Sequence, residues 1–565
     1  MKQFLKEVVD ILREGSDLTE EEIKGLIETP PDPQLGDYAF SCFVLAKKLR
    51  KPPDIIAEGL SRRLKPREYI SQIKNAGPYI NFTVDRSKFT EAVLREIFTG
   101  RDSFGDWEVG SGKTVVVDFS SPNIAKPFGI GHLRSTVIGN SICKLYESLG
   151  YKCIRINHLG DWGTQFGKLI TAYKRWGEEK CLEEDPVGYL YDLYVRFHAE
   201  AQRDGSLEDE AREWFKRLEE GDREATHLWS RFKDISLMEF QRIYDQLEIG
   251  FDSYTGESFY NAMIDETIER LRAAGLVRES QGALIVDLEK YGMPPCLLRK
   301  KDGSTLYATR DIAAALYRFR TYHFDRMIYV VGADQKLHFQ QVFKVLDLMG
   351  CNWVENCVHV PFGLIRFGQE RMSTRKGNIV LLEDVFRKAV ELTVEIMEEK
   401  NPALKGKEGI AKDVGIGAII FADLSSKRMK NVDFEWDKVL NFNGETGPYV
   451  QYTHARFSSV LRKYGKEVDG DFDPSVLSED PAFDVTRNLG RFPDIVKRSA
   501  DEYEPSLMTN YLLDLCGAAN RFYNSCRVLT RDPRITNARI LLVYCVRTVL
   551  NKGLNLLGIK APDEM

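Results

Sequence analysis

The chain is poor in the residue patterns that build metal centres and disulfides. Its ten cysteines include no CxxC pair, and its eight histidines include no HxxxH pair. The nearest two cysteines, Cys351 and Cys357, are not at zinc-finger spacing. We therefore expect buried structural thiols, no metal-ligating residues, and no tightly bound metal or organic cofactor.

Long apolar segments are missing too. No run of about 18 uncharged apolar residues occurs in the sequence, which argues against a membrane span. The first residues, MKQFLKEVVDILREG, mix charged and apolar positions and lack the apolar core and cleavage site of a signal peptide. We expect a cytoplasmic protein without a membrane partner.

An overall excess of positive charge, a common sign of nucleic-acid binding, is also absent. The net charge is −6, from 79 basic and 85 acidic residues. Binding depends on local charge, however, and the stretch from Arg521 to Lys560 holds eight basic residues against the single acid Asp532. Residues 467–484 hold seven acids and no base. This asymmetry fits either a basic face in the C-terminal region or an ordinary solvated helix surface.

The order of predicted strands and helices indicates the fold class. A chain of 565 residues suggests roughly three to five structural units. The short β-branched runs at 114–119 (TVVVDF) and 151–157 (YKCIRIN) are typical of buried strands. A polar loop and a helix over about 132–148 separate them. Strand, loop, helix and strand predict an α/β domain with a Rossmann-type parallel sheet.

Other segments surround this sheet. A helical stretch at 38–64 and a strand at 79–85 predict an α+β domain at the N-terminus. Residues 185–249, dense in Glu, Lys and Arg at helical spacing, predict a helical insertion. We expect ALIVDL (283–288) and MIYVVG (327–332) to resume the sheet. From about residue 441 the pattern predicts a separate all-α bundle.

The segment SSPNIAKPFGIGHLRS at 120–135 carries the strongest chemical signal. It joins a buried strand to a helix, where backbone N–H groups and the helix N-terminus can face phosphates. Gly129 and Gly131 leave room for a nucleotide against the backbone. His132 can donate to a phosphate oxygen, and Lys126 supplies a mobile positive charge.

This segment is similar to the HxGH signature of class I aminoacyl-tRNA synthetases, and its PNIAKPF part resembles the arginyl branch. Gly129 stands where the signature usually has its first His. RMSTRKGN (371–378) resembles the second signature, KMSKS, but Arg371 replaces its first Lys and Thr374 its second. The resemblance implies that Lys126 acts in place of the missing Lys, with Lys376 as another candidate.

The resemblance also implies which residues form the site. The groups that stabilise the transition state would be Lys126, His132, Arg371, Ser373 and Lys376. The residues that bind ATP would be Pro122, Phe128, Gly129, Gly131, His132, Gly332, Asp334 and Met372.

A substrate arginine needs planar carboxylates and an aromatic face for its guanidinium. Three positions match the side-chain pocket of the arginyl enzymes: Asp118, Tyr307 and Asp311. Asn123 and Gln335 match the residues that hold the α-amino and carboxylate groups. The stretch NHLGDWGTQFG (157–167) resembles the same family, and we expect a structural role for its Asp161.

Resemblance to the family extends over nearly the whole chain. Segments 446–463, 516–529 and 554–565 resemble its helical anticodon-binding domain, where aromatics such as Tyr523 could stack on unpaired bases. The first hundred residues resemble its domain for the tRNA elbow. The implied domains are 1–105 (tRNA elbow), 106–365 (catalytic, with the insertion at about 185–250), 366–440 (second signature and connecting helices) and 441–565 (anticodon).

The implied reaction is arginine–tRNA ligation. The arginine carboxylate would attack the α-phosphate of ATP, carried with Mg²⁺, and release pyrophosphate; the arginyl group would then pass to the terminal ribose of tRNA(Arg). We expect a monomer. Two rivals stay open: a cofactor-forming adenylyltransferase, which would lack the second signature and the RNA-binding tail, and a tRNA-binding relative without catalysis. Gly129, Arg371 and Thr374 are the only support for the second rival.

Overall fold

The computed structural model describes residues 2–30, 32–301, 303–305, 307–367, 380–442 and 444–565. The chain divides into two compact units. The first comprises Met1–Phe104, Arg456–Phe492 and Asp514–Leu550, and the second Gly105–Ala455, Pro493–Leu513 and Asn551–Met565. Each unit is built from segments that lie far apart in the sequence.

The first unit opens with a four-stranded antiparallel sheet, in the order β1 (Ile27–Glu28), β2 (Tyr38–Ser41), β4 (Tyr79–Val84) and β3 (Ile70–Ala76). Its helices are α1 (Lys2–Gly15), α2 (Glu20–Leu26), α3 (Phe43–Leu49), α4 (Pro53–Arg63) and α5 (Arg86–Gly100). The α+β prediction is confirmed. The predicted helix at 38–64 is wrong at its start, because residues 38–41 pair with β4 as a strand.

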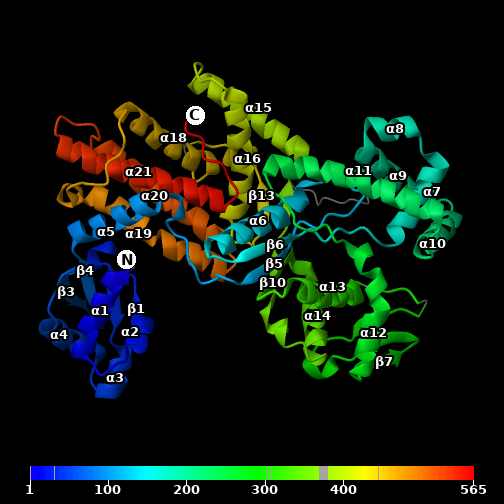
Figure 1. Ribbon diagram of the computed structural model, residues 1–565, viewed down its shortest axis with the longest axis horizontal. Helices are drawn as coiled ribbons and strands as arrows, with labels where there is room; N and C mark the ends of the chain where they lie inside the picture. Colours follow the sequence, from blue (N-terminus) through cyan, green and yellow to red (C-terminus); the bar gives the residue numbers. More distant parts are fainter. Residues whose placement is uncertain (1, 31, 302, 306, 368–379, 443) are drawn as a thin grey trace. The chain divides into compact units, whose positions relative to one another are not determined.

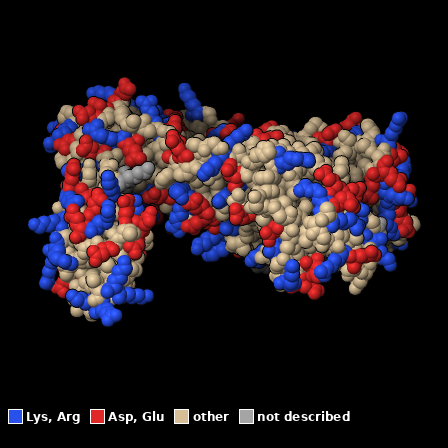
Figure 2. Space-filling model, turned by 60° about the horizontal axis from the view of Figure 1, so that its bottom comes forward, with Lys and Arg blue, Asp and Glu red and all other residues tan. Residues whose placement is uncertain are grey.

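The C-terminal region is all helical, as predicted. Its helices are α18 (Gly447–Tyr464), α19 (Asp480–Asp501), α20 (Ser506–Ser525) and α21 (Pro533–Leu556). Within the first unit, Tyr523 is 37% exposed, and the guanidinium of Arg456 lies 5.4 Å from the centre of its ring. Basic and acidic groups are interspersed over the face drawn in Figure 2.

The second unit is organised around a parallel sheet, which confirms the predicted α/β class. Its strand order is β11 (Cys357–Phe362), β10 (Arg326–Gly332), β5 (Thr114–Asp118) and β6 (Lys152–Ile156). The apolar residues of β5 are fully buried, because helices pack on a parallel sheet from both faces. Helix α6 (Leu133–Ser148) follows the loop after β5.

One predicted strand belongs elsewhere. Residues 283–288 do not resume the parallel sheet; β8 (Ala283–Val286) lies between β7 (Val277–Ser280) and β9 (Cys296–Arg299) in a separate antiparallel sheet. A short apolar run has the same appearance in either kind of sheet, so its partner cannot be read from its composition.

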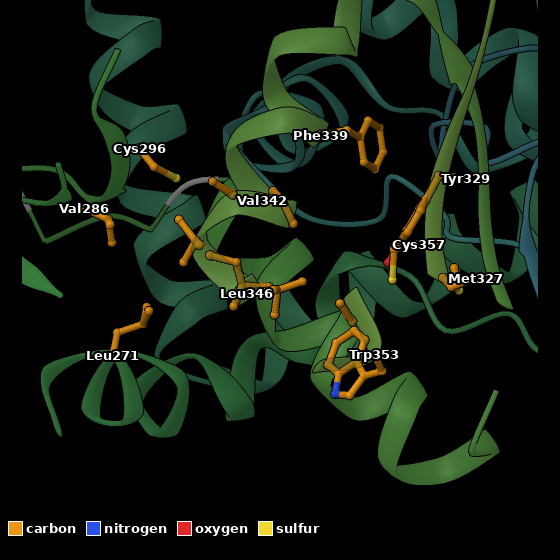
Figure 3. Close-up of a cluster of buried hydrophobic side chains, with 14 of the residues drawn as sticks. Leu271, Val286, Cys296, Met327, Tyr329, Phe339, Val342, Leu346, Trp353 and Cys357 are labelled. Carbon is orange, nitrogen blue, oxygen red and sulfur yellow. The ribbon is translucent and has the colours of Figure 1, made fainter. Parts of the chain in front are cut away.

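A hydrophobic core joins this small sheet to the parallel one. It lies between α12 (Ile264–Ala273), α13 (Tyr307–Tyr322), α14 (Lys336–Leu348) and strands β10 and β11 (Figure 3). Leu346 and Val342 of α14 point into it together with Trp353 and Met327. This core fixes α13 and α14 against the sheet, and both helices carry predicted site residues.

The predicted insertion is a group of helices: α7 (Thr164–Trp176), α8 (Glu179–Glu184), α9 (Pro186–Ala201), α10 (Ser206–Glu219) and α11 (Arg223–Leu247). They gather at one end of the second unit (Figure 1). Beyond the core, β12 (Ile365–Phe367) pairs in parallel with β13 (Val432–Phe434). Helices α15 (Leu382–Lys400), α16 (Lys407–Ser425) and α17 (Trp436–Val439) complete the unit. No helix among the described residues has the length and apolarity needed to span a membrane.

Candidate active site

Several of the predicted site residues that the structure describes lie at the carboxyl edge of the parallel sheet. Asp118 ends β5 and lies in register with Tyr329 of the neighbouring β10. Gly332 ends β10, and Asp334 and Gln335 follow it in a 3₁₀ turn, Ala333–Gln335. Since strands β5, β6 and β10 are parallel and adjacent, their following loops share one edge, the usual place for a ligand in such a sheet.

The loop after β5 has a strained backbone. Ser120, Ser121 and Ala125 have φ angles of 70°, 49° and 57°. The left-handed conformation costs a residue with a side chain roughly 1–2 kcal/mol. Helix α11 holds the loop in place: Tyr244 Oη lies 2.8 Å from Ser120 Oγ, and Ser236 Oγ accepts a 2.9 Å hydrogen bond from Ala125 N–H. The helical insertion therefore forms one wall of the site.

His132 is set up to donate a hydrogen bond from Nε2. It stands at the end of the 3₁₀ turn Ile130–His132, just before α6, and its Nδ1 accepts from the backbone N–H of Gly129 at 3.2 Å. Burial lowers the pKa of His132 to about 4, the Gly129 bond opposes this, and the charge of Lys126 lowers it further. The ring is therefore neutral at pH 7 with its proton on Nε2. Phe128 packs 5.0 Å away, centre to centre.

The remaining residues of the first signature surround this ring. Pro122 is buried and its carbonyl accepts from Gly160 N–H at 3.1 Å, while the backbone of Asn123 bridges to Gly160. A Cβ at Gly160 would lie 2.2 Å from Asn123 Oδ1, so a larger residue there would displace the Asn123 side chain. Lys126 is partly exposed, and its ammonium lies 5.6 Å from the ring centre of Tyr194 in α9.

The second signature falls outside the described residues, and so do all the residues predicted from it: Arg371, Met372, Ser373, Thr374 and Lys376. The chain on either side is described. Ile130 N–H donates to Val380 O at 2.9 Å, and Leu382 N–H donates to Phe128 O at 3.0 Å. The chain that leaves the second signature is thus hydrogen-bonded to the first signature.

A buried arginine ties the first signature to the chain that enters the second. Arg134 of α6 donates from Nη1 to the carbonyls of Gly363 (3.1 Å) and Lys430 (2.7 Å). Its Nε lies 3.0 Å from Asp423 Oδ1 of α16, and both side chains are 1% exposed. Burial raises the pKa of Asp423 to about 6, although Arg134 opposes the shift.

Arg134→Met should destabilise the second unit by about 3–5 kcal/mol, because it leaves a carboxyl group buried without its partner. The change should appear as a lower urea midpoint. The double variant Arg134→Met/Asp423→Leu removes both charged groups and should regain part of the loss. Equal midpoints for wild type and Arg134→Met would contradict this role for the ion pair.

The predicted arginine pocket centres on Asp311 in the first turns of α13. Its Oδ2 lies 2.5 Å from Nε2 of His338, and its Oδ1 lies 3.8 Å from Nε2 of His158. Burial alone would raise the pKa of Asp311, but the hydrogen bond and charge of His338, with the charges of His158 and Arg318, lower it below its ordinary value. The carboxylate is therefore ionised at neutral pH. Tyr307, at the start of α13, is 57% exposed.

Asp118 already has a cationic partner within the chain. Its Oδ2 accepts from Nη1 of Arg318 at 2.8 Å, its Oδ1 accepts from Ser121 Oγ at 3.0 Å, and the residue is 4% exposed. The Arg318 guanidinium also lies 5.9 Å and 5.6 Å from the ring centres of Tyr260 and Tyr329. Asp118 and Arg318 thus form a neutral pair behind the pocket.

A further carboxyl group beside the pocket was missed by the sequence analysis. Glu257 begins the 3₁₀ turn Glu257–Met263, and its charge influences both Tyr307 and Asp311. Its Oε2 is buried and has no hydrogen-bond partner among the described residues. Burial raises the pKa of Glu257 to about 8, with Arg310 opposing and Asp311 adding to the shift.

Asp161 has the structural role that was expected. It is fully buried and accepts from Ser258 N–H (2.8 Å), Ser258 Oγ (2.7 Å) and Lys233 Nζ (2.6 Å). A Cβ at Gly256 would come within 2.6 Å of its Oδ1. Asp161 therefore holds the turn that carries Glu257 against α11.

The remaining predicted residues are open to ligand. Asn123, Asp334 and Gln335 are exposed at the sheet edge, as is Gly131. The structure therefore brings the described ATP-binding and arginine-binding candidates to one edge, with the acidic side chains toward α13 and the signature loop toward α6.

Comparison with known proteins covers the whole chain. The family model described as the catalytic domain of class I tRNA synthetases (R) matches residues 96–436. The arginyl-tRNA synthetase N-terminal domain matches residues 2–84, and the DALR anticodon-binding domain matches 450–565.

Similar proteins agree with the domain matches. The chain is 50% identical to the arginine–tRNA ligase of Halothermothrix orenii and 48% identical to that of Alkaliphilus metalliredigens; both alignments span 100% of the chain and 100% and 99% of the relatives. The arginyl-tRNA synthetase structure from Thermus thermophilus superposes with a TM-score of 0.81 at 27% identity, over 95% of the chain and 96% of that structure.

Proposed function

The chain belongs to the class I arginyl-tRNA synthetase family, and from this premise we propose how its residues activate arginine with ATP and pass it to tRNA. The observation that carries the proposal is that one edge of the sheet bears two groups of residues with different chemistry, here called the loop half and the pocket half. One half is the signature loop with Lys126 and the neutral His132. The other half is an acidic pocket formed by Asp311 and Glu257 beside Tyr307.

The loop half stabilises charge on ATP. The Nε2–H of His132 donates to a phosphate oxygen, since its Nδ1 is already bonded to Gly129. The ammonium of Lys126 moves from its place near Tyr194 to the phosphates, where charge builds up as pyrophosphate leaves. Gly332 and Asp334 face the nucleoside. Such groups act by position and electrostatics, without a covalent enzyme intermediate.

We propose that Mg²⁺ enters with ATP as part of the substrate, bound to its phosphates. The described residues contain no group of three or more His, Cys, Asp and Glu side chains placed to hold a metal ion. Arg371, Ser373 and Lys376 remain proposed partners of the phosphates, and Met372 of the nucleoside, from the resemblance.

The pocket half recognises arginine. Asp311 and Glu257 pair with the guanidinium, and the exposed ring of Tyr307 lies along it. Asp118 acts through Arg318, whose charge it balances, so that the pocket keeps net negative charge for a cationic substrate. Asn123 and Gln335, both exposed at the same edge, hold the α-amino and carboxylate groups.

Arginine affinity should depend on pH through Glu257. Its pKa of about 8 means that the carboxyl group is protonated below pH 8, and a bound guanidinium needs it ionised. The KM for arginine should therefore fall as pH rises from 6.5 to 8.5, by up to about tenfold per pH unit at the acidic end. Glu257→Gln should raise KM and remove this slope. A wild-type KM that is flat over this range would contradict the assignment.

The tRNA-binding part of the proposal rests on the helical C-terminal region. Tyr523 and Arg456 lie together on the first unit, an exposed aromatic beside a cation, which suits an unpaired anticodon base. We further propose a monomer that acts in the cytoplasm, with domains at 1–105, 106–365, 366–440 and 441–565.

Arginine-dependent ATP–pyrophosphate exchange, measured with tRNA present, tests the activation step. Exchange that appears with arginine and not with lysine or citrulline is the expected result. No exchange with arginine would refute the proposal and favour the tRNA-binding relative without catalysis. Exchange that needs a cofactor precursor in place of arginine would favour the adenylyltransferase.

A further inference from the structure

We propose that His338 is a positioning residue for arginine recognition: its Nε2–H fixes the carboxylate of Asp311 in the plane that receives the substrate guanidinium. This inference rests on the proposed function and deepens it. It assigns a specificity role to α14, a helix that supplies no other predicted arginine contact from within its bounds, Lys336–Leu348.

The contact that supports the inference is short and specific. His338 Nε2 lies 2.5 Å from Asp311 Oδ2, whereas His158 Nε2 lies 3.8 Å from Oδ1 of the same carboxylate. The two side chains of the short contact are 21% and 22% exposed, so they are sheltered but reachable from the pocket. Of the two histidines, only His338 is at hydrogen-bonding distance.

Orientation matters because the last torsion of an aspartate side chain is soft. Nothing in the covalent structure fixes the plane of the carboxylate. A guanidinium presents its donors in one plane and binds a carboxylate best with two parallel hydrogen bonds. A carboxylate has about four acceptor sites. One bond from His338 therefore fixes the plane and still leaves acceptor sites for the substrate.

On the other side of Asp311, His158 is itself held in place by its neighbours. His158 Nδ1 lies 3.3 Å from Nη2 of Arg318 and 3.2 Å from the carbonyl of Thr255. Arg318 in turn is bonded to Asp118. A series of contacts thus runs from Asp118 on β5 through Arg318 and His158 toward Asp311. His338 on α14 contacts the other oxygen of the Asp311 carboxylate. The core that packs α14 against the sheet sets where this last contact lies.

A purely electrostatic role for His338 makes a different prediction for a neutral donor. The charge of His338 helps to lower the pKa of Asp311, so in an electrostatic role all neutral replacements would change arginine binding alike. In the positioning role, a replacement that keeps the N–H donor retains arginine binding, and one without a donor loosens it. The difference between the two replacements therefore separates the two roles.

Two substitutions test the inference by ATP–pyrophosphate exchange, with arginine varied at saturating ATP and ATP varied at saturating arginine. His338→Leu removes the donor, and His338→Gln keeps an N–H donor close to the position of Nε2. We expect His338→Leu to raise the KM for arginine at least tenfold with kcat and the KM for ATP within about twofold. His338→Gln should restore the KM for arginine to within about threefold of wild type.

Discrimination against citrulline provides a second measurement. Citrulline carries a neutral ureido group in place of the guanidinium. His338→Leu should lower the ratio of kcat/KM for arginine to kcat/KM for citrulline by about the factor by which it raises the KM for arginine. Three results would overturn the inference. The KM for arginine could be unchanged or lower in His338→Leu, or it could rise in His338→Gln as much as in His338→Leu. The third is a rise of the KM for ATP parallel to that for arginine. Wild type without arginine-dependent exchange would instead refute the proposed function.

Discussion

Asp311→Asn should lower kcat/KM for arginine by about 10²- to 10³-fold, because a buried charge pair loses one partner when the guanidinium arrives. Asparagine keeps the size of the side chain and one acceptor oxygen. It removes the negative charge of the carboxylate, whose pKa is lowered in the wild type by the charges of His338, His158 and Arg318. The effect should fall on the KM for arginine, since the carboxylate lies in the pocket half of the site.

The KM for ATP provides the internal control for this variant and should stay within about threefold of wild type. Asp347→Asn on α14 is a matched control, because Asp347 is an exposed residue that pairs with Lys344 of the same helix. Its kinetics should equal those of wild type. Unchanged arginine kinetics in Asp311→Asn would show that the guanidinium binds elsewhere.

Lys126→Met should reduce kcat for arginine activation by about 10²- to 10³-fold, the usual cost of removing one group that stabilises transition-state charge. Methionine retains most of the apolar stem and lacks the ammonium. The KM for arginine should change by no more than about threefold, because Lys126 lies in the loop half of the site near Tyr194, away from α13. Steady-state arginine-dependent ATP–pyrophosphate exchange, with tRNA present, measures this step.

Two lysine variants make the assignment of Lys126 specific. Lys113→Met changes an exposed lysine just before the amino end of β5, the strand that leads into the signature loop, and should leave kcat unchanged. Lys376→Met tests the other candidate from the second signature. A large loss in Lys376→Met with near-normal activity in Lys126→Met would reverse the proposed division between them.

Local sequence patterns predicted the centre of the fold well. The strands expected at 114–119 and 151–157 and the helix at about 132–148 correspond to β5, β6 and α6. These elements are decided by contacts close in sequence: buried β-branched runs, a polar loop, and a helix that follows it directly. The predicted helical insertion also formed, although its helices begin earlier, with α7 at Thr164.

Two segments were assigned wrongly because the composition of a segment does not show which strand it pairs with. Residues 38–41 became β2 through pairing with β4, some forty residues later in the chain. Residues 283–286 became β8 in an antiparallel sheet, since β7 and β9 flank them directly in sequence. In both cases pairing decided the outcome, and composition does not encode the partner.

The site was harder to predict than the fold for the same reason. Asp118 was expected to face the substrate, yet Arg318, 200 residues away in sequence, supplies its cation. Glu257 is distinguished by the burial of its carboxyl group, a property that appears only when the turn packs beside α13. His338 had no predicted role, because its contact with Asp311 appears only when α14 lies beside α13.

The most direct test of the central claim is the charging of unfractionated tRNA with each of the twenty radiolabelled amino acids, with ATP and Mg²⁺ present. We predict that arginine alone becomes acid-precipitable with tRNA, and that Asp311→Asn loses this charging while Asp347→Asn keeps it. Charging with another amino acid, or no charging with arginine by the folded wild-type chain, would contradict the account.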